Sequence, residues 1–320
     1  MAEYKGIKGF KVQYLSADPS NPIIGQTWYN STSKNLKYTG VTTAGAWATG
    51  NNMNTARNYL GGAGTQTAAL AFGGYTTAGT GATEEYDGSV WTNSNNMNTA
   101  RYELAGAGIQ TAALAFGGFT TAITGATEEY DGNSWATSSG SLNTVRNYLA
   151  GAGTQTAGLA FGGYTGTVRT GATEEYNGTS WATSPGSMNT TRNGLAGLGT
   201  QTAALAFGGN LPPRTGATEE YDGSTWTTVN SLNTVRAFLG NAGIQTAGLA
   251  FGGDIPPSTG ATEEYDGISW TTSPASMSTA RYALGGAGNT SAALAFGATG
   301  GATEEWTGAG SPLTKTITVS

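Results

Sequence analysis

The sequence contains neither cysteine nor histidine in its 320 residues. A disulfide framework is therefore excluded, as is any zinc, haem or copper site that uses these two residue types. Catalysis by a histidine base is excluded for the same reason. Charged residues are also scarce, at 11% of the chain, and the net charge is −6. Because nucleic-acid binding needs a basic face, this acidic balance predicts that nucleic acid is not a partner.

Long apolar runs are missing as well. No hydrophobic stretch reaches the length of a membrane span, and the first residues, Met1 to Lys5, lack the apolar segment of a signal peptide. We therefore expect a chain that is made in a cytoplasm and is not inserted in a membrane. Glycine, by contrast, is abundant at 52 residues, and aromatic residues make up 10%. This aromatic content is enough to form a core, so disorder of the whole chain is not expected.

Comparison of the sequence with itself shows six copies of one unit. Each copy contains a phrase like Asn-Thr-Ala-Arg, then Ala-Ala-Leu-Ala-Phe-Gly-Gly, then Gly-Ala-Thr-Glu-Glu-Tyr. A tryptophan closes five of the units, and Trp47 has the same offset before the first arginine. In the last copy, Ala298 replaces the second glycine and Trp306 replaces the tyrosine. The repeated arginines, spaced 44 to 46 residues apart, are Arg57, Arg101, Arg146, Arg192, Arg236 and Arg281.

Each unit holds four short segments with β-strand character. In the first unit these are residues 59–64, 67–72 and 83–86 and a segment that starts at Trp91. Asp-Gly or Asn-Gly between the third and fourth segments is typical of a tight hairpin. No segment keeps a 3.6-residue period, so helices should be scarce. Four antiparallel strands in a unit of about 45 residues predict an all-β fold in which each unit is a propeller blade.

The order of these landmarks resembles the kelch repeat. Gly-Gly follows an apolar strand, and Glu-x-Tyr, Trp and Arg come after it, over most of the chain from about Trp47 to Trp306. This resemblance implies a kelch-type β-propeller. The residue chemistry is consistent with it, because the small residues at 60–64 suit inner strands that crowd at an axis. In the second strand, large residues share one face and alanines the other, which lets neighbouring blades nest.

The number of blades has two interpretations. Six units are explicit, whereas dividing 320 residues by about 45 per blade gives about seven. We favour seven, with residues 1–50 as a divergent N-terminal segment that forms a closing blade, 51–306 as the six repeats, and 307–320 as a closing strand. The alternative is six blades with an N-terminal hairpin outside the ring. The strands expected in the extra blade are residues 26–29, 36–38 and 46–48, with an inner strand from 11–15 or 314–319.

The Glu-Glu pairs contain twelve of the carboxylates. Adjacent strand residues point to opposite faces, so the two carboxylates of a pair cannot act on one substrate as a glycosidase pair does. We predict instead that one glutamate per blade pairs with a repeated arginine, and that the tryptophans pack between blades. No catalytic residue, metal site or cofactor is predicted. The glutamates expected to pair are Glu84, Glu128, Glu174, Glu219, Glu263 and Glu304.

The units differ most between Gly-Gly and Thr-Gly-Ala-Thr-Glu-Glu. These loops join the second and third strands, so they should all lie at one end of the propeller. A rigid disk that displays different side chains there predicts a binding surface, and drift in solvent-exposed loops is the alternative. Aromatic and arginine side chains in the loops favour binding. The candidate binding residues are Tyr75, Phe119, Tyr164, Arg169, Asn210, Arg214 and Asp254.

The N-terminal segment shows a second resemblance. Leu15-Ser-Ala-Asp-Pro-Ser-Asn-Pro, Gly25-Gln-Thr-Trp-Tyr-Asn-Ser-Thr and Leu36-Lys-Tyr together resemble a segment common in bacteriophage virion proteins, especially tail-fibre and appendage proteins. The kelch-like units also resemble those of marine phages. The resemblance implies a structural protein on the virion surface, with other virion proteins and a host-surface glycan or protein as partners.

Our leading hypothesis is therefore a non-enzymatic tail or capsid appendage for host recognition. The alternatives are capsid decoration without receptor binding and a protein-interaction scaffold.

Overall fold

The structure, a computed structural model, describes residues 12–20, 22–41, 44–310 and 312–317. The chain divides into two compact units. One is the continuous segment Ala46–Thr307, and the other combines the terminal segments Met1–Gly45 and Gly308–Ser320.

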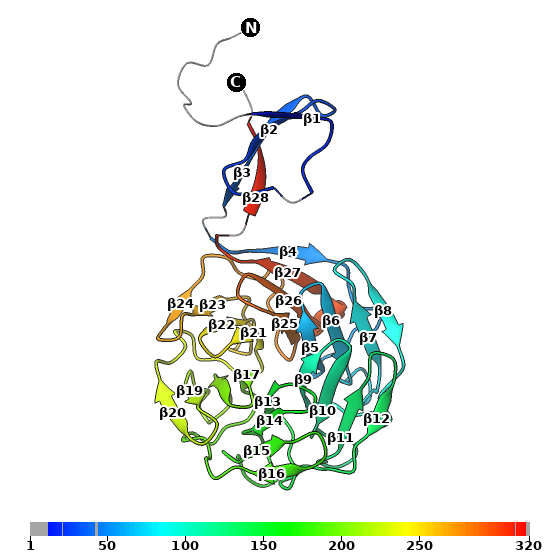
Figure 1. The fold of residues 1–320 in the computed structure, drawn as a ribbon. Coiled ribbons are helices and arrows are strands. Elements are labelled where there is room, and N and C mark those ends of the chain that lie inside the picture. Colours follow the sequence, from blue (N-terminus) through cyan, green and yellow to red (C-terminus); the bar gives the residue numbers. More distant parts are fainter. Residues whose placement is uncertain (1–11, 21, 42–43, 311, 318–320) are drawn as a thin grey trace. The chain divides into compact units, whose positions relative to one another are not determined.

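Ala46–Thr307 forms a ring of six four-stranded antiparallel sheets, the blades, around a central axis (Figure 1). The innermost strands contact one another in chain order, and the ring is closed because the innermost strand of blade 6 contacts that of blade 1. Within its described residues, η1 (Thr299–Gly301) is the one helical turn.

In every blade, the strand named first lies at the axis and the strand named last lies at the rim. Blade 1 contains β5 (Gly61–Thr65), β6 (Ala68–Phe72), β7 (Thr83–Tyr86) and β8 (Trp91–Ser94). Blade 2 contains β9 (Ala105–Ile109), β10 (Ala112–Phe116), β11 (Thr127–Tyr130) and β12 (Trp135–Thr137). Blade 3 contains β13 (Ala150–Gly153), β14 (Gly158–Phe161), β15 (Thr173–Tyr176) and β16 (Trp181–Thr183). Blade 4 contains β17 (Ala196–Thr200), β18 (Ala203–Phe207), β19 (Thr218–Tyr221) and β20 (Trp226–Val229). Blade 5 contains β21 (Gly240–Ile244), β22 (Ala247–Phe251), β23 (Thr262–Tyr265) and β24 (Trp270–Thr272). Blade 6 contains β25 (Gly285–Gly288), β26 (Ala292–Phe296), β27 (Thr303–Thr307) and β4 (Ala46–Gly50).

Blade 6 is completed by the strand that precedes blade 1 in the chain. Strand β4 pairs antiparallel with β27, and Trp47 is registered with Trp306. Two segments far apart in the sequence are thereby hydrogen-bonded, which closes the ring. In the segment 307–320, expected to supply the closing strand, the described residues Pro312–Ile317 pair with residues 36–41 instead. The reason is that β4 carries Trp47, whose Nε1 donates to Thr262 Oγ1 at 2.8 Å, the bond type that the repeated tryptophans make at the other blade junctions.

The terminal unit contains the seventh four-stranded sheet. Its strand order is β1 (Gln13–Leu15), β2 (Thr27–Asn30), β3 (Asn35–Val41) and β28 (Pro312–Ile317). Strand β1 runs parallel to β2, and the other two pairings are antiparallel. Seven four-stranded sheets are thus present, as expected from the sequence. Six of them close the ring, which is the arrangement of the six-bladed alternative, because β28 pairs with β3 instead of entering a seventh blade.

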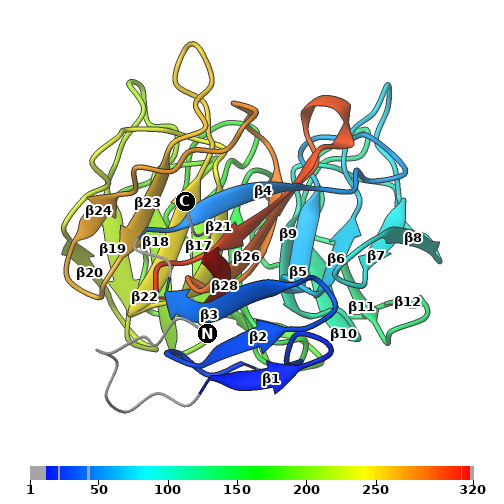
Figure 2. The same cartoon turned by 90° about the horizontal axis from the view of Figure 1, so that it is seen from above.

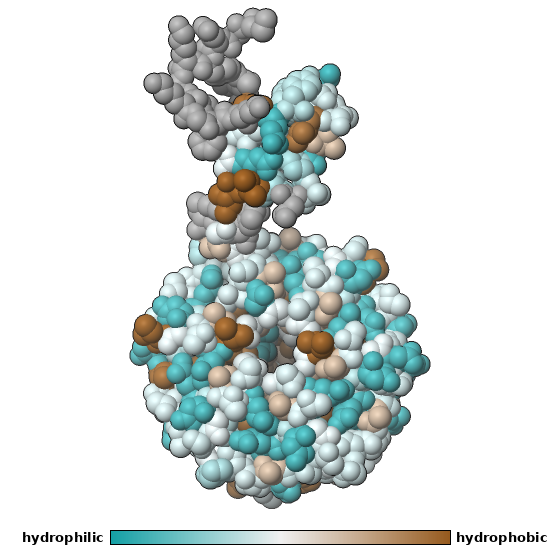
Figure 3. All heavy atoms as spheres, viewed as in Figure 1, coloured by the Kyte–Doolittle hydropathy of each residue, from teal (hydrophilic) through white to brown (hydrophobic). Residues whose placement is uncertain are grey.

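The core of the ring lies between neighbouring blades. Leu70 and Phe72 of β6, both fully buried, pack against Ala113 and Ala115 of β10. The large face of one blade thus meets the small face of the next, as predicted. Glycine is required where the inner strands crowd together: a Cβ on Gly106 would lie 2.5 Å from Cζ of Phe72. Large apolar side chains at the surface are scattered, and the ring face visible in Figure 3 shows them as separate spots on a mainly hydrophilic surface.

Candidate functional site

Each repeated arginine forms a buried ion pair with the first glutamate of the following Glu-Glu pair. In blade 2, Nη1 of Arg101 lies 3.0 Å from Oε1 of Glu128, and both side chains are fully buried. The carboxylate also accepts the backbone N–H groups of Asn98 at 2.7 Å and Thr99 at 3.2 Å. Burial lowers the pKa of Arg101 to about 10, and the charge of Glu128 opposes this shift. The other pairs are Arg57–Glu84, Arg146–Glu174, Arg192–Glu219, Arg236–Glu263 and Arg281–Glu304.

These ion pairs tie each connector between blades to the third strand of the blade that follows. They are closed to solvent and recur in all six blades. A buried charge is tolerated only with such partners, so the pairs have a structural role. Their charged groups are therefore not available to a ligand.

Hydrogen bonds between side chains also lock neighbouring blades together. The second glutamate of a pair accepts the hydroxyl of the tyrosine in the next blade, as for Tyr176 and Glu129 at 2.6 Å. The tryptophan of the outer strand donates Nε1 to a threonine of the preceding blade, as for Trp135 and Thr83 at 2.9 Å. The tryptophans thus lie between blades, as predicted. These repeated bonds make the ring a scaffold on which the non-repeated side chains are displayed.

The non-repeated loops all lie on one face of the ring, here called the variable face. The loops between second and third strands rise from one edge of the ring, the upper edge in Figure 2. Each of the five long loops bridges to the residue that follows a repeated arginine: Tyr75 N donates to Asn58 O at 2.8 Å, and Asn58 N to Tyr75 O at 3.1 Å. The variable face therefore comprises the five long loops, the short sixth loop and the connectors between blades. Of the predicted binding residues, Tyr75 is exposed, and the remaining six, partly exposed, are Phe119, Tyr164, Arg169, Asn210, Arg214 and Asp254.

The two arginines expected to bind ligand are held by neighbouring units. Nε of Arg169 donates to Oδ1 of Asn193 at 3.2 Å. Arg214 forms an ion pair with Asp254 of the next loop, with 32% and 22% of the two side chains exposed. Arg214 and Asp254 therefore neutralise each other, whereas Arg169 keeps its charge and uses one N–H group for the bond with Asn193.

A second set of residues, which sequence reasoning missed, forms a cluster at the axis. These residues each follow a repeated arginine by two positions, and their backbones form a closed ring of hydrogen bonds from each N–H to the carbonyl of the preceding unit, between 2.7 and 2.9 Å. All have positive φ, from 52° to 60°. The ring consists of Tyr59, Glu103, Tyr148, Gly194, Phe238 and Ala283.

Three aromatic rings of this cluster contact one another at the axis. The ring centroid of Tyr59 lies 5.7 Å from that of Tyr148 and 5.9 Å from that of Phe238, and the centroids of Tyr148 and Phe238 are 5.3 Å apart. Burial is the main cause that raises the pKa of Tyr59 to about 12, with smaller contributions from Tyr282 and Glu103. Burial likewise raises the pKa of Glu103. The signal in the sequence was the variation at the two positions between a constant arginine and a constant leucine, of which the second supplies these residues.

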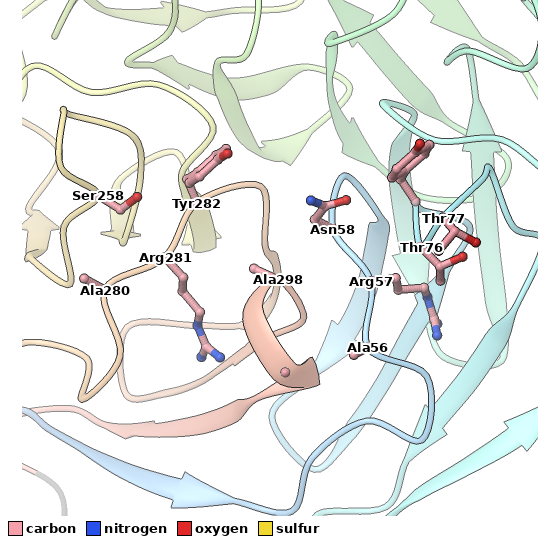
Figure 4. A pocket seen from close by; sticks show the side chains of 12 residues that line it. Ala56, Arg57, Asn58, Thr76, Thr77, Ser258, Ala280, Arg281, Tyr282 and Ala298 are labelled. Carbon is pink, nitrogen blue, oxygen red and sulfur yellow. The ribbon is translucent and has the colours of Figure 1, made fainter.

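The short loop of the sixth unit leaves a cavity of about 480 Å³ on the variable face, here called the face cavity. The first loop and the fifth loop form its sides, with Ala298 of the sixth unit between them (Figure 4). Tyr75 and Tyr282 line it and are 37% and 39% exposed. Its hydroxyl and amide groups come from Asn58, Thr76, Thr77 and Ser258.

The face cavity presents a neutral lining. Arg57 and Arg281 contribute to its walls, but their guanidinium groups are held in the ion pairs with Glu84 and Glu304. Figure 4 shows both arginine side chains running away from the space between Tyr282 and the first loop. The cavity therefore offers aromatic rings, hydroxyls and one amide.

Among the residues that the structure describes, no group of three or more metal-ligating side chains is placed to hold a metal ion. Within the same part of the chain, no helix is long and apolar enough to cross a membrane.

Comparison with known proteins bears on the fold. No family model matches the chain, and no curated protein matches it. Among solved structures, the structure of YjhT matches with a TM-score of 0.65 and 13% sequence identity, and the match covers 83% of this chain and 96% of that chain. At this level of identity the likeness shows the fold alone, which is a β-propeller.

Proposed function

We propose that the protein is a non-enzymatic recognition protein that binds through the variable face of its ring. The observation that carries this proposal is the face cavity, which exists because the sixth loop is shorter than the other five. The scaffold around it is fixed by repeated bonds, whereas Tyr75, Ser258 and Tyr282 in its lining stand at positions that differ from unit to unit. Binding sites are commonly built in this way, on loops that a rigid framework positions.

The lining of the face cavity favours a carbohydrate as ligand. The exposed rings of Tyr75 and Tyr282 offer apolar faces for stacking, and their hydroxyls remain polar handles. Hydroxyl and amide groups nearby can both donate and accept hydrogen bonds, which matches the hydroxyls of a sugar. The volume of about 480 Å³ lies within the range of small-molecule sites.

A role at a virion surface is the biological setting of the proposal. It rests on the resemblance of the N-terminal segment to virion proteins and on the hydrogen bonds that hold this segment together in the terminal unit. There, one carboxylate oxygen of Asp18 accepts from Trp28 Nε1 at 3.0 Å and Asn30 Nδ2 at 2.7 Å, and the other pairs with Lys37. We propose that the terminal unit binds other virion proteins and that the ring binds a glycan of the host surface.

The non-enzymatic part of the proposal rests on the use of the carboxylates. In the Glu-Glu pairs, six of the twelve carboxylates hold buried arginines. Five more accept a tyrosine hydroxyl from the next blade. Groups committed to such bonds are poor candidates for a general acid or base.

The test is a glycan-binding measurement on the intact protein. Labelled wild-type protein should bind a defined set of host-surface polysaccharides saturably, and the double variant Tyr75→Ala/Tyr282→Ala should bind at least tenfold more weakly, because both stacking faces are removed. The matched control is Ile109→Ala, which truncates an exposed side chain on a hairpin remote from the variable face. Release of oligosaccharide from the polysaccharide would contradict the non-enzymatic role. Absence of binding by folded wild-type protein that is nevertheless found in virions would favour capsid decoration.

A further inference from the structure

The junction between blades 5 and 6 differs from the other five. Elsewhere, a glutamine amide at the first hairpin of a blade donates to two carbonyls of the preceding blade, as Gln110 Nε2 does to Ala69 O at 3.0 Å and Tyr86 O at 2.8 Å. A tyrosine hydroxyl also crosses each of these junctions to a glutamate, as Tyr130 does to Glu85. Each of these five junctions therefore contains the same two donors, a glutamine amide and a tyrosine hydroxyl.

Both donors are replaced at the sixth junction. Thr290 stands where the other blades have glutamine, and Trp306 stands where they have tyrosine. The indole of Trp306 turns to its own blade, where Nε1 donates to Thr290 O at 2.9 Å. Neither residue reaches the carboxylate of Glu264 in blade 5.

A cavity of about 320 Å³, here called the junction notch, occupies the place of the missing groups. Its lining includes Glu264, Tyr265, Thr271 and Thr290. It lies beside the hairpins that join first to second and third to fourth strands. Because strands alternate in direction, this is the end of the blades opposite to the variable face.

Glu264 lacks the partner that its counterparts have. Within the described part of the chain, no hydrogen bond or ion pair is made by its carboxylate, whereas the corresponding Glu220 accepts from Tyr265 at 2.9 Å. Burial raises the pKa of Glu264, since the charged form is poorly solvated. Asp266, at the rim, already accepts the backbone N–H groups of Ile268 and Ser269 with one oxygen. The lining contains no lysine or arginine.

We propose that the junction notch binds a guanidinium group, which supplies the donors that Thr290 and Trp306 do not. A guanidinium is planar and has five N–H donors in a fixed fork. It can therefore pair with the carboxylate of Glu264 and donate at the same time to the carbonyls that a glutamine amide satisfies at the other junctions. An ammonium ion concentrates its donors at one point and matches this arrangement less well. The proposal is independent of binding at the variable face.

Titration followed by backbone amide NMR tests this site directly, with methylguanidinium as the probe and n-butylammonium as the comparison. We expect saturable shifts confined to the junction notch, with n-butylammonium binding at least fivefold more weakly. N-acetylarginine methylamide should bind as well if the site accepts arginine carried by a polypeptide, whereas binding of methylguanidinium alone would restrict it to small guanidines.

Two variants and one control separate binding at the notch from general effects. Thr290→Gln restores the residue of the other blades and should abolish binding, because the amide occupies the notch. Ser291→Gln places the same side chain one residue further on and should bind as the wild type does. Glu264→Gln removes the charge without breaking a bond and should weaken binding at least tenfold. Absence of saturable shifts at the notch, equal binding of the two cations, or unchanged binding by Thr290→Gln would overturn the proposal.

Discussion

Replacing Glu128 by glutamine should destabilise the whole ring, although the change alters only one functional group. The carboxylate lies 3.0 Å from the guanidinium of Arg101 and is fully buried with it. It also accepts two backbone N–H groups, from Asn98 and Thr99. Glutamine keeps the shape but carries no charge, so the arginine is left buried without a counter-ion.

The expected size of the effect follows from the burial. Removing one partner of a buried ion pair typically costs about 3–5 kcal/mol in the free energy of unfolding. Glu129, the next residue, is only partly buried and makes one hydrogen bond, with Tyr176 at 2.6 Å. Glu129→Gln should therefore cost only about 1 kcal/mol, the usual value for one hydrogen bond.

A double variant separates the charge from the backbone bonds. Replacing a whole buried ion pair by apolar residues is often neutral. In Arg101→Met/Glu128→Leu, however, the part-buried N–H groups of Asn98 and Thr99 lose their acceptor, which costs at most about 1–3 kcal/mol for each group. The double variant should thus remain less stable than the wild type.

Urea unfolding, followed by tryptophan fluorescence, measures these differences in the free energy of unfolding. The dependence of this free energy on urea concentration should be the same for all the variants. A loss below about 1 kcal/mol for Glu128→Gln would refute the structural role assigned to the ion pairs.

Three other predictions concern packing, charge and closure. Gly106→Ala should lower the free energy of unfolding by about 1–3 kcal/mol, because the new Cβ would lie 2.5 Å from a buried aromatic carbon; an unchanged urea midpoint would argue against such crowding. Burial raises the pKa of Glu264, so the native state holds the proton more firmly than the unfolded chain does, and this group's favourable contribution is lost as pH rises through its folded pKa. Glu264→Gln should therefore be more stable than the wild type at pH 7 and equal to it at pH 3, and greater stability at pH 3 alone would contradict the sign. A chain of residues 46–307 should unfold in one cooperative transition, whereas 51–307, which lacks β4, should not; equal behaviour of the two would show that β4 does not close the ring.

Much of the ring was predictable because its signals are local and repeated. The third strand of blade 1 has the expected bounds, Thr83–Tyr86, since alternation and a tight hairpin fix it. The arginines and glutamates could be paired because a buried charge needs a partner wherever it recurs. Strand β4 was recognised as a strand, but its partner β27 lies more than 250 residues away in sequence, and strand character does not specify which edge a strand joins.

The parts of the sites that sequence reasoning missed depend on the meeting of several blades. Tyr59, Tyr148 and Phe238 come from three different units, and only the ring geometry brings their side chains to the axis. Arg169 and Arg214 were expected to face a ligand, yet each finds a partner on the next unit, which the sequence of one loop does not reveal. The face cavity arises from a loop that is short, so the residues that line it belong to other units.

The central claim is that the variable face recognises a surface glycan at the face cavity. Its most direct test is the binding of labelled protein to bacterial host cells before and after the sixth loop is lengthened. Inserting the Thr-Thr-Ala-Gly of the first loop after Ala298 fills the cavity, while the side-chain hydrogen bonds between neighbouring blades remain. We predict saturable binding by the wild type and its loss in the filled variant with an unchanged unfolding transition. Equal binding by the two proteins would contradict the claim.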